Sequence, residues 1–353
     1  MHSKKKFIKN RSSHFSSKES RRVKAMVFLF VCLFCIAGQA WAESVQYQEA
    51  RERFEKGEFL LAMLAAQKAV EEDGENPAYR YLYGAVLLEL KQHSEGEINL
   101  RKAVKLEPDN AEFLYTLADL LITQKSDVAI RKELRTGIGQ PRFGNVDQEG
   151  VEMLKRAIEL NPEHFKARHR LGRAYTDLNQ HDLALEQFRA IADKNPRYPW
   201  IHSSLAVIYM DEGSVEEAIR ALKKEIEIYP EHHSARLELG EVFLKYGDSE
   251  QALKELLQVK EQALFSKDKT VLHLSLSKAY RDTGQLKKAL ISLKQSIALD
   301  ASVPNAYYLG SQIYRQMGEP ELARQQMVIF QRVYREDRQK KLGFMDDQPV
   351  SRK

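Results

Sequence analysis

The sequence predicts an all-α solenoid of about eight helix-turn-helix units, and three regularities along the chain support this fold class. Four prolines stand at intervals of 54, 34 and 34 residues, each directly after a helical apolar stretch: Pro108, Pro162, Pro196 and Pro230. Pairs of a large residue followed by a small one keep the same register: Tyr83-Gly84, Leu117-Ala118, Leu171-Gly172, Leu205-Ala206 and Leu239-Gly240. Turn glycines do the same: Gly213, Gly247, Gly284 and Gly318. The basic period is therefore 34 residues.

Each unit contains the residues that its own packing needs. The first helix places a small residue beside a large apolar one, which leaves a notch where a neighbouring backbone approaches closely. The second helix has a small residue such as Ala218 and a larger one, Leu222, four positions later, so that large and small side chains interdigitate. Proline then ends the helix, because it lacks an amide proton and disfavours helical geometry in the preceding residue. One unit alone leaves an apolar face uncovered, so stability requires stacked neighbours.

At these positions the sequence resembles the tetratricopeptide repeat family, whose members are right-handed superhelical stacks of helix-turn-helix units. The fourth unit matches the family pattern best: Leu171, Gly172, Tyr175, Ala184, Phe188 and Pro196. The resemblance covers residues 43–338, with units that start at residues 43, 77, 111, 165, 199, 233, 270 and about 304. It leaves residues 339–353 as a polar tail.

Three departures from the pattern lead to local expectations. Glu49 and Arg53 occupy usually apolar positions, which predicts a polar cap in the first unit. In the eighth unit Leu309-Gly310 comes one residue early relative to Ala323, which predicts a turn longer by one residue. A usually small position late in the second helix is filled differently in four units, which predicts irregular packing there: Ile191, Glu225, Val259 and Ser296.

The first 42 residues have the order of a secretory signal, which is basic, then apolar, then small-x-small. The apolar run Met26–Gly38 has 13 residues, fewer than the roughly 20 that a membrane-spanning helix needs. We expect cleavage after Ala42, so that residues 1–42 are a signal peptide. The alternative is an uncleaved amino-terminal anchor, which would be the chain's one attachment to a membrane. Both readings place the body outside the cytoplasm, in the periplasm or secreted.

Charge and residue types exclude several function classes. Residues 1–42 hold nine basic groups and one acidic group, a balance of +8, which leaves −3 for residues 43–353 out of the total of +5. Nucleic-acid binding is disfavoured, because it needs concentrated positive charge. Cys32 and Cys35 are the only cysteines, so disulfides and cysteine nucleophiles are not expected in the mature chain. No two histidines have i, i+4 spacing and no serine nucleophile motif is present, so we expect no catalytic residue, metal site or cofactor.

The third unit has an insertion. It is 54 residues long against the usual 34, and the additional residues, about 126–146, fall between predicted helices Leu114–Gln124 and Gln148–Leu160. Residues 126–134 are expected to form a short helix, followed by a glycine-rich basic loop. No strand precedes this loop and its glycines lack nucleotide-binding spacing, so phosphate binding is disfavoured. Two alternatives remain: the loop contacts a partner, or it is a family-specific insertion without a binding role.

The resemblance also implies a concave surface lined by the first helices. It assigns these candidate partner-binding residues to that surface: Tyr81, Tyr115, Asp119, His169, Arg173, Asp177, Trp200, Met210, Lys278, Arg281, Tyr307 and Tyr314. Aromatic residues interleaved with arginine are typical of interface centres. The alternative for each tyrosine is packing between adjacent first helices. The family's carboxylate clamp and asparagine ladder are absent, and the ladder positions read as follows: Gln48, Leu82, Thr116, Arg170, Ser204, Glu238, Ser275 and Tyr308.

These observations predict an exported, non-catalytic scaffold that holds a protein or extended peptide of the cell envelope in its groove. The signal favours a bacterium with a periplasm. One alternative is an adaptor in exopolysaccharide or outer-membrane assembly or secretion, where a glycan is contacted. Another is an enzyme with an unrecognised site.

Overall fold

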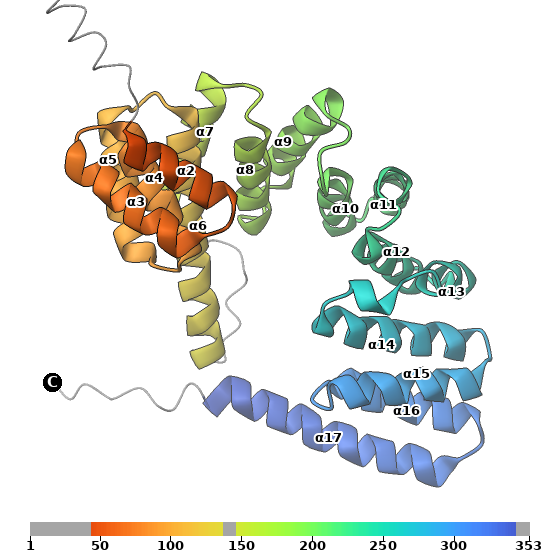
Figure 1. Cartoon of the computed structure of the whole chain (residues 1–353). Coiled ribbons are helices and arrows are strands. Elements are labelled where there is room, and N and C mark those ends of the chain that lie inside the picture. Colours follow the sequence, from red (N-terminus) through yellow and green to blue (C-terminus); the bar gives the residue numbers. More distant parts are fainter. Residues whose placement is uncertain (1–43, 137–145, 344–353) are drawn as a thin grey trace, which may run out of the picture. The chain divides into compact units, whose positions relative to one another are not determined.

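A computed structural model describes residues 44–136 and 146–343 of the chain (Figure 1). Over these ranges the regular elements are helices, with no strand, and each odd-numbered helix packs against the even-numbered helix before it. The helix pairs are α2 (Val45–Glu55) with α3 (Phe59–Glu72), α4 (Pro77–Glu89) with α5 (His93–Leu106), α6 (Ala111–Thr136) with α7 (Gln148–Leu160), α8 (Phe165–Asp177) with α9 (His181–Lys194), α10 (Ile201–Asp211) with α11 (Val215–Ile228), α12 (His233–Lys245) with α13 (Ser249–Leu256), α14 (Ser266–Asp282) with α15 (Leu286–Leu299), and α16 (Pro304–Gln316) with α17 (Pro320–Gly343). The predicted all-α stack of helix-turn-helix units is confirmed.

The pairs fall into two compact units that divide after Leu106. The unit that ends at Leu106 contains α2 to α5, and its core alternates alanine with larger residues. Ala62 and Ala66 of α3 pack with Leu82 and Val86 of α4, and all four are buried. Small residues on one helix thus receive large residues of the next, as the repeat pattern predicts.

The unit that begins at Glu107 contains α6 to α17 and a short 3-10 turn, η1 (Glu261–Ala263). Its small positions are required for contact between the two helices of a pair. A Cβ added to Gly172 would lie 2.5 Å from the ring of Phe188, and one added to Gly240 would lie 2.6 Å from Leu256. Both distances are far below van der Waals contact, so a Cβ at either glycine would force the facing side chain to move.

The insertion differs from the expected short helix. Helix α6 runs without interruption from Ala111 to Thr136, so residues 126–134 extend the first helix of the third repeat. The predicted second helix, Gln148–Leu160, is confirmed as α7. Residues 137–145, the rest of the predicted loop, lie outside the described residues.

Three further local expectations need correction. The turn between α16 and α17 has the usual length. The small residue that keeps the repeat spacing is the fully buried Ser311 and not Gly310, since Ser311 stands seven residues before the turn glycine Gly318, as Gly240 stands before Gly247. The first repeat was expected to be a polar cap, but only α2 is polar. Helix α3 exposes three leucines, Leu60, Leu61 and Leu64, at 65%, 48% and 52% of their surface, so the cap is partly apolar. Helix α17 continues through residues 339–343, where a tail was expected.

Candidate functional site

Polar contacts join neighbouring first helices at four of the five junctions from α6 to α16. We name the side of α6, α8, α10, α12, α14 and α16 that carries these contacts the first-helix face. The contacts are Arg170 of α8 to Asp119 of α6, His169 of α8 to Ser204 of α10 at 3.1 Å, Ser275 of α14 to Glu241 of α12 at 3.4 Å, and Arg281 of α14 to Gln312 of α16. Three predicted site residues, Asp119, His169 and Arg281, take part in these contacts.

Trp200 is the most unusual residue of this face. It immediately precedes α10 and has a left-handed backbone conformation, with φ of 63°. A bulky residue rarely adopts this region because its Cβ crowds the backbone. Its side chain makes no capping hydrogen bond, and 43% of its surface is exposed.

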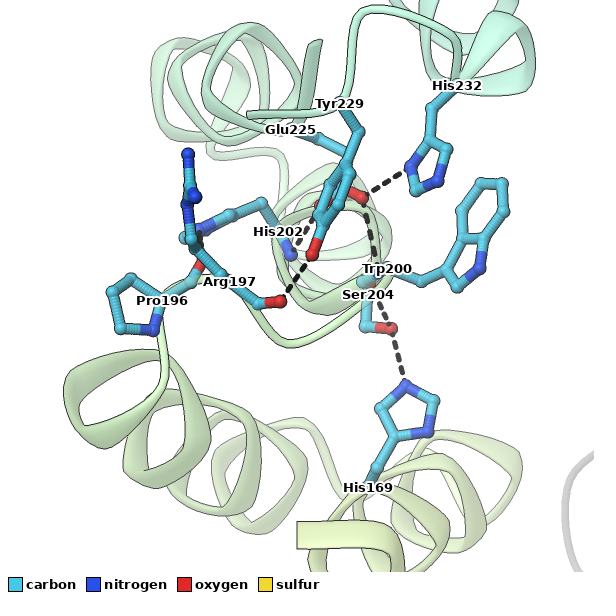
Figure 2. Close-up of polar contacts among 9 residues, drawn as sticks. All are labelled: His169, Pro196, Arg197, Trp200, His202, Ser204, Glu225, Tyr229 and His232. Carbon is cyan, nitrogen blue, oxygen red and sulfur yellow. Dashed lines mark hydrogen bonds and ion pairs between the residues drawn. The ribbon is translucent and has the colours of Figure 1, made fainter. Parts of the chain in front are cut away.

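The carboxylate of Glu225, on α11, caps α10 in place of Trp200. It accepts the backbone N–H of Trp200 at 3.1 Å and of His202 at 3.2 Å (Figure 2). These amides begin α10 and have no partner inside the helix, and a negative charge at a helix amino terminus is favourable. Glu225 itself is 0% exposed, so the hydrogen bonds compensate the burial of its charge.

His232 connects this carboxylate to the exposed indole. Its Nδ1 lies 2.8 Å from a carboxylate oxygen of Glu225, and its ring stacks on Trp200 with centroids 3.9 Å apart and planes 2° apart. Tyr229 stacks on the same imidazole at 4.6 Å and donates its hydroxyl proton to the carbonyl oxygen of Arg197. The indole therefore stacks on His232, which Glu225 and Tyr229 hold in turn, as Figure 2 shows.

His169 lies beside this group and is neutral at physiological pH. Burial, together with the charges of Arg173 and Arg170, lowers the pKa of His169 to about 4. The hydroxyl of Ser204 donates to the carbonyl oxygen of Trp200 at 2.9 Å. Because that proton is engaged, His169 must donate its Nε2–H to Ser204, which defines the imidazole tautomer. This contact holds α8 and α10 in register.

The other predicted site residues are placed in different ways. Tyr115 is partly buried, packs on His164 at 5.1 Å, and burial raises its pKa to about 12. Tyr307 is buried and its hydroxyl donates to the carbonyl oxygen of Ala301 at 3.0 Å, so it packs between elements. Lys278 donates to the carbonyl oxygen of Leu244 at 3.5 Å. Arg173 is exposed, and the remaining candidates are partly buried: Tyr81, Asp177, Met210 and Tyr314.

The roles of Glu225, Tyr229 and His232 were not predicted from the sequence, where Glu225 indicated only irregular packing. A charged residue at a position that other repeats fill with small or apolar residues was the available signal, since a buried carboxylate needs hydrogen-bond donors nearby.

Among the described residues there is no group of three His, Cys, Asp or Glu that could hold a metal ion. No helix among them is both long and apolar enough to cross a membrane.

Comparison with known proteins identifies the repeat. Family models described as "Tetratricopeptide repeat" match residues 77–110, 148–208, 209–268 and 272–303, together more than half of the chain. The chain is 24% identical over 284 residues to the peroxisomal targeting signal receptor of Candida albicans, covering 73% of this chain and 48% of that protein. It is 23% identical over 205 residues to anaphase-promoting complex subunit 3 of Schizosaccharomyces pombe, covering 58% of this chain and 27% of that protein. The chain thus spans less than half the length of these curated relatives.

A solved structure agrees on the fold. A tetratricopeptide repeat protein from Parabacteroides merdae superimposes with a TM-score of 0.51 at 16% identity, covering 79% of this chain and 97% of that one. At this identity the likeness shows the helical-repeat architecture alone.

Proposed function

Because the chain belongs to the tetratricopeptide repeat family, whose members serve in general as non-catalytic protein-interaction scaffolds, we propose that it holds an envelope protein or an extended peptide on its first-helix face. We further propose that it is exported, with residues 1–42 removed. The order of basic, apolar and small residues in this segment supports export.

The observation that carries the proposed binding face is the exposed indole of Trp200. A strained backbone conformation persists only where the surrounding structure holds it, and such strain is concentrated at functional sites. Here a buried carboxylate and a stacked imidazole hold the indole while 43% of Trp200 stays exposed. Tryptophan is among the residues that contribute most to binding energy at protein interfaces.

The same face offers further contact groups around Trp200. Val207, on α10, is 46% exposed. Arg173 is exposed on α8. Aromatic residues and arginine are the residue types enriched at interface centres.

Site-specific photo-crosslinking tests this function. A photoreactive amino acid at Val207 is expected to form an adduct with a protein of the envelope fraction, and Trp200→Ala is expected to abolish that adduct. The matched control places the same group at Glu216, which is exposed on the second helix α11. Adducts that form equally from both positions, or only from Glu216, would contradict the proposal.

Export is tested separately by the intact mass of the protein recovered from the native envelope. The expected mass corresponds to a chain that begins at Glu43. A mass that includes residues 1–42 would show that the signal is retained.

A further inference from the structure

One junction of the first-helix face lacks the polar contact that the others have. Contacts join α6 to α8, α8 to α10, α12 to α14, and α14 to α16. Between α10 and α12, the side chains of the described residues form no such hydrogen bond or ion pair on this face. The positions equivalent to Asp119–Arg170 and Glu241–Ser275 are here Val207 and Glu238.

Glu238 is a partly buried carboxylate without a partner among the described residues. The charged groups whose electrostatic interaction with Glu238 affects its pKa are all acidic. They are Glu241 on its own helix, Glu225 on α11 and Asp268 on α14. Burial and these charges raise the pKa of Glu238 to about 7. The positive charge of Lys278 interacts with Glu241, where it lowers the pKa, but it is not among the charges that affect the pKa of Glu238. An uncompensated carboxylate in such a place is unfavourable in the free protein.

The apolar side of this junction is open. Val207 exposes 46% and Trp200 exposes 43% of its surface; Val207 lies on α10, which Trp200 immediately precedes. The ammonium or guanidinium of a long basic side chain is attracted to a carboxylate and to the face of an indole, while its aliphatic stem packs on apolar groups. Glu238 and Val207 occupy the paired positions of this junction, and Trp200 immediately precedes the helix of Val207, so a carboxylate, an apolar group and an indole belong to the junction.

We propose, building on the scaffold function above, that the junction of the fifth and sixth repeats is a subsite for a basic side chain of an extended partner polypeptide. Glu238 pairs with the lysine or arginine of the partner, whose stem lies on Val207. Trp200 stacks against a neighbouring residue of the same peptide.

The charge of the face also gives the peptide a direction. Arg173 is exposed on α8, whereas Glu238 and Glu241 lie on α12. A basic residue is therefore favoured over α12 and disfavoured over α8, because like charges at an interface oppose binding.

Fluorescent extended peptides of Gly and Ser that carry fixed Arg, Gln or Glu at successive positions test the proposal. The full mature chain is expected to bind Arg-containing peptides about tenfold or more tightly than matched Gln peptides, with Glu peptides weakest. Glu238→Gln is expected to remove this preference. Glu216→Gln, which removes the same charge from an exposed site on α11, is expected to keep it, and circular dichroism verifies that both variants are folded.

Four results would overturn the subsite. One is equal affinity for Arg and Gln peptides, the second is an equal loss of preference in Glu238→Gln and Glu216→Gln, and the third is binding of none of the peptides. Binding of the neutral glycan cellohexaose in place of peptides would also overturn it. Failure of the scaffold function itself is distinguished by the crosslink at Val207, which is expected to persist if only the preference for basic residues is wrong.

Discussion

The fourth and fifth repeats fill the same buried position with opposite chemistry. Ile191 of α9 and Glu225 of α11 occupy equivalent places late in the second helix, and both are 0% exposed. In the fourth repeat, His164 caps the first helix by accepting the backbone N–H of Ala167 at 3.2 Å. In the fifth, Trp200 makes no side-chain cap and Glu225 supplies one from α11. The packing of the repeat buries this position in both cases. Of the two repeats, only the fifth needs a carboxylate there, because its first helix has no other side-chain cap.

The largest expected effect comes from placing the carboxylate in the fourth repeat. Ile191→Glu buries a charge where the first helix is already capped, so it should destabilise the protein by about 4 kcal/mol or more. Urea denaturation followed by circular dichroism measures the loss. A loss below about 1 kcal/mol would mean that any repeat accepts a carboxylate at this position, and the comparison would fail.

Removal of the carboxylate from the fifth repeat should have the next largest effect. Glu225→Ala leaves the N–H groups of Trp200 and His202 without an acceptor and His232 without its partner, which should cost about 2–4 kcal/mol. Hydrogen exchange should accelerate in the first turn of α10 before it changes in α16. Glu225→Gln is the control, since it keeps an acceptor and should cost less. Uniform acceleration over the described helices would contradict a local cap.

Removal of the charge of Glu238 should stabilise the protein, whereas removal of the carboxylate of Glu225 should destabilise it. Its pKa in the folded protein, about 7, lies above the ordinary value of 4.5, so its ionisation opposes folding. The penalty is absent below about pH 4.5, grows through the interval between the two pKa values, and is complete above about pH 7. Glu238→Gln should therefore stabilise the protein by about 1–3 kcal/mol near pH 8 and much less near pH 5. Equal midpoints of urea unfolding for both proteins near pH 8 would contradict this.

The smallest effect on stability is expected for Trp200→Gly. Glycine relieves the left-handed conformation, worth about 1 kcal/mol, while the stacking on His232, worth a similar amount, is lost. The net change should stay within about 1 kcal/mol, although the crosslink from Val207 should disappear. A large loss of stability would assign Trp200 to the core of the junction and not to binding.

The repeat pattern predicted the helices because it depends on local spacing, but it did not predict contacts made by residues that differ between repeats. The contact of Phe188 with Gly172 agrees with the predicted interdigitation of large and small residues, and Leu256 meets Gly240 at the same separation. The partnership of Glu225 with the amides of Trp200 and His202 was not predicted, because those donors exist only when proline-rich residues 196–199 leave α10 uncapped. The continuous α6 was missed for a related reason: residues 126–134 are helix-forming, and no residue in this segment ends the helix.

The partner's affinity for a set of matched variants tests the central claim most directly. With the crosslinked partner in hand, Tyr115→Ala, Arg173→Ala and Trp200→Ala should each weaken binding by roughly 1–3 kcal/mol, because desolvated aromatic and arginine anchors contribute most of the interface energy. The control neutralises Lys223 and Lys224, which are exposed on α11, and should leave affinity unchanged. If the control abolishes binding while the three anchor variants retain it, the first-helix face is not the binding surface, and the insertion at residues 126–146 becomes the leading candidate.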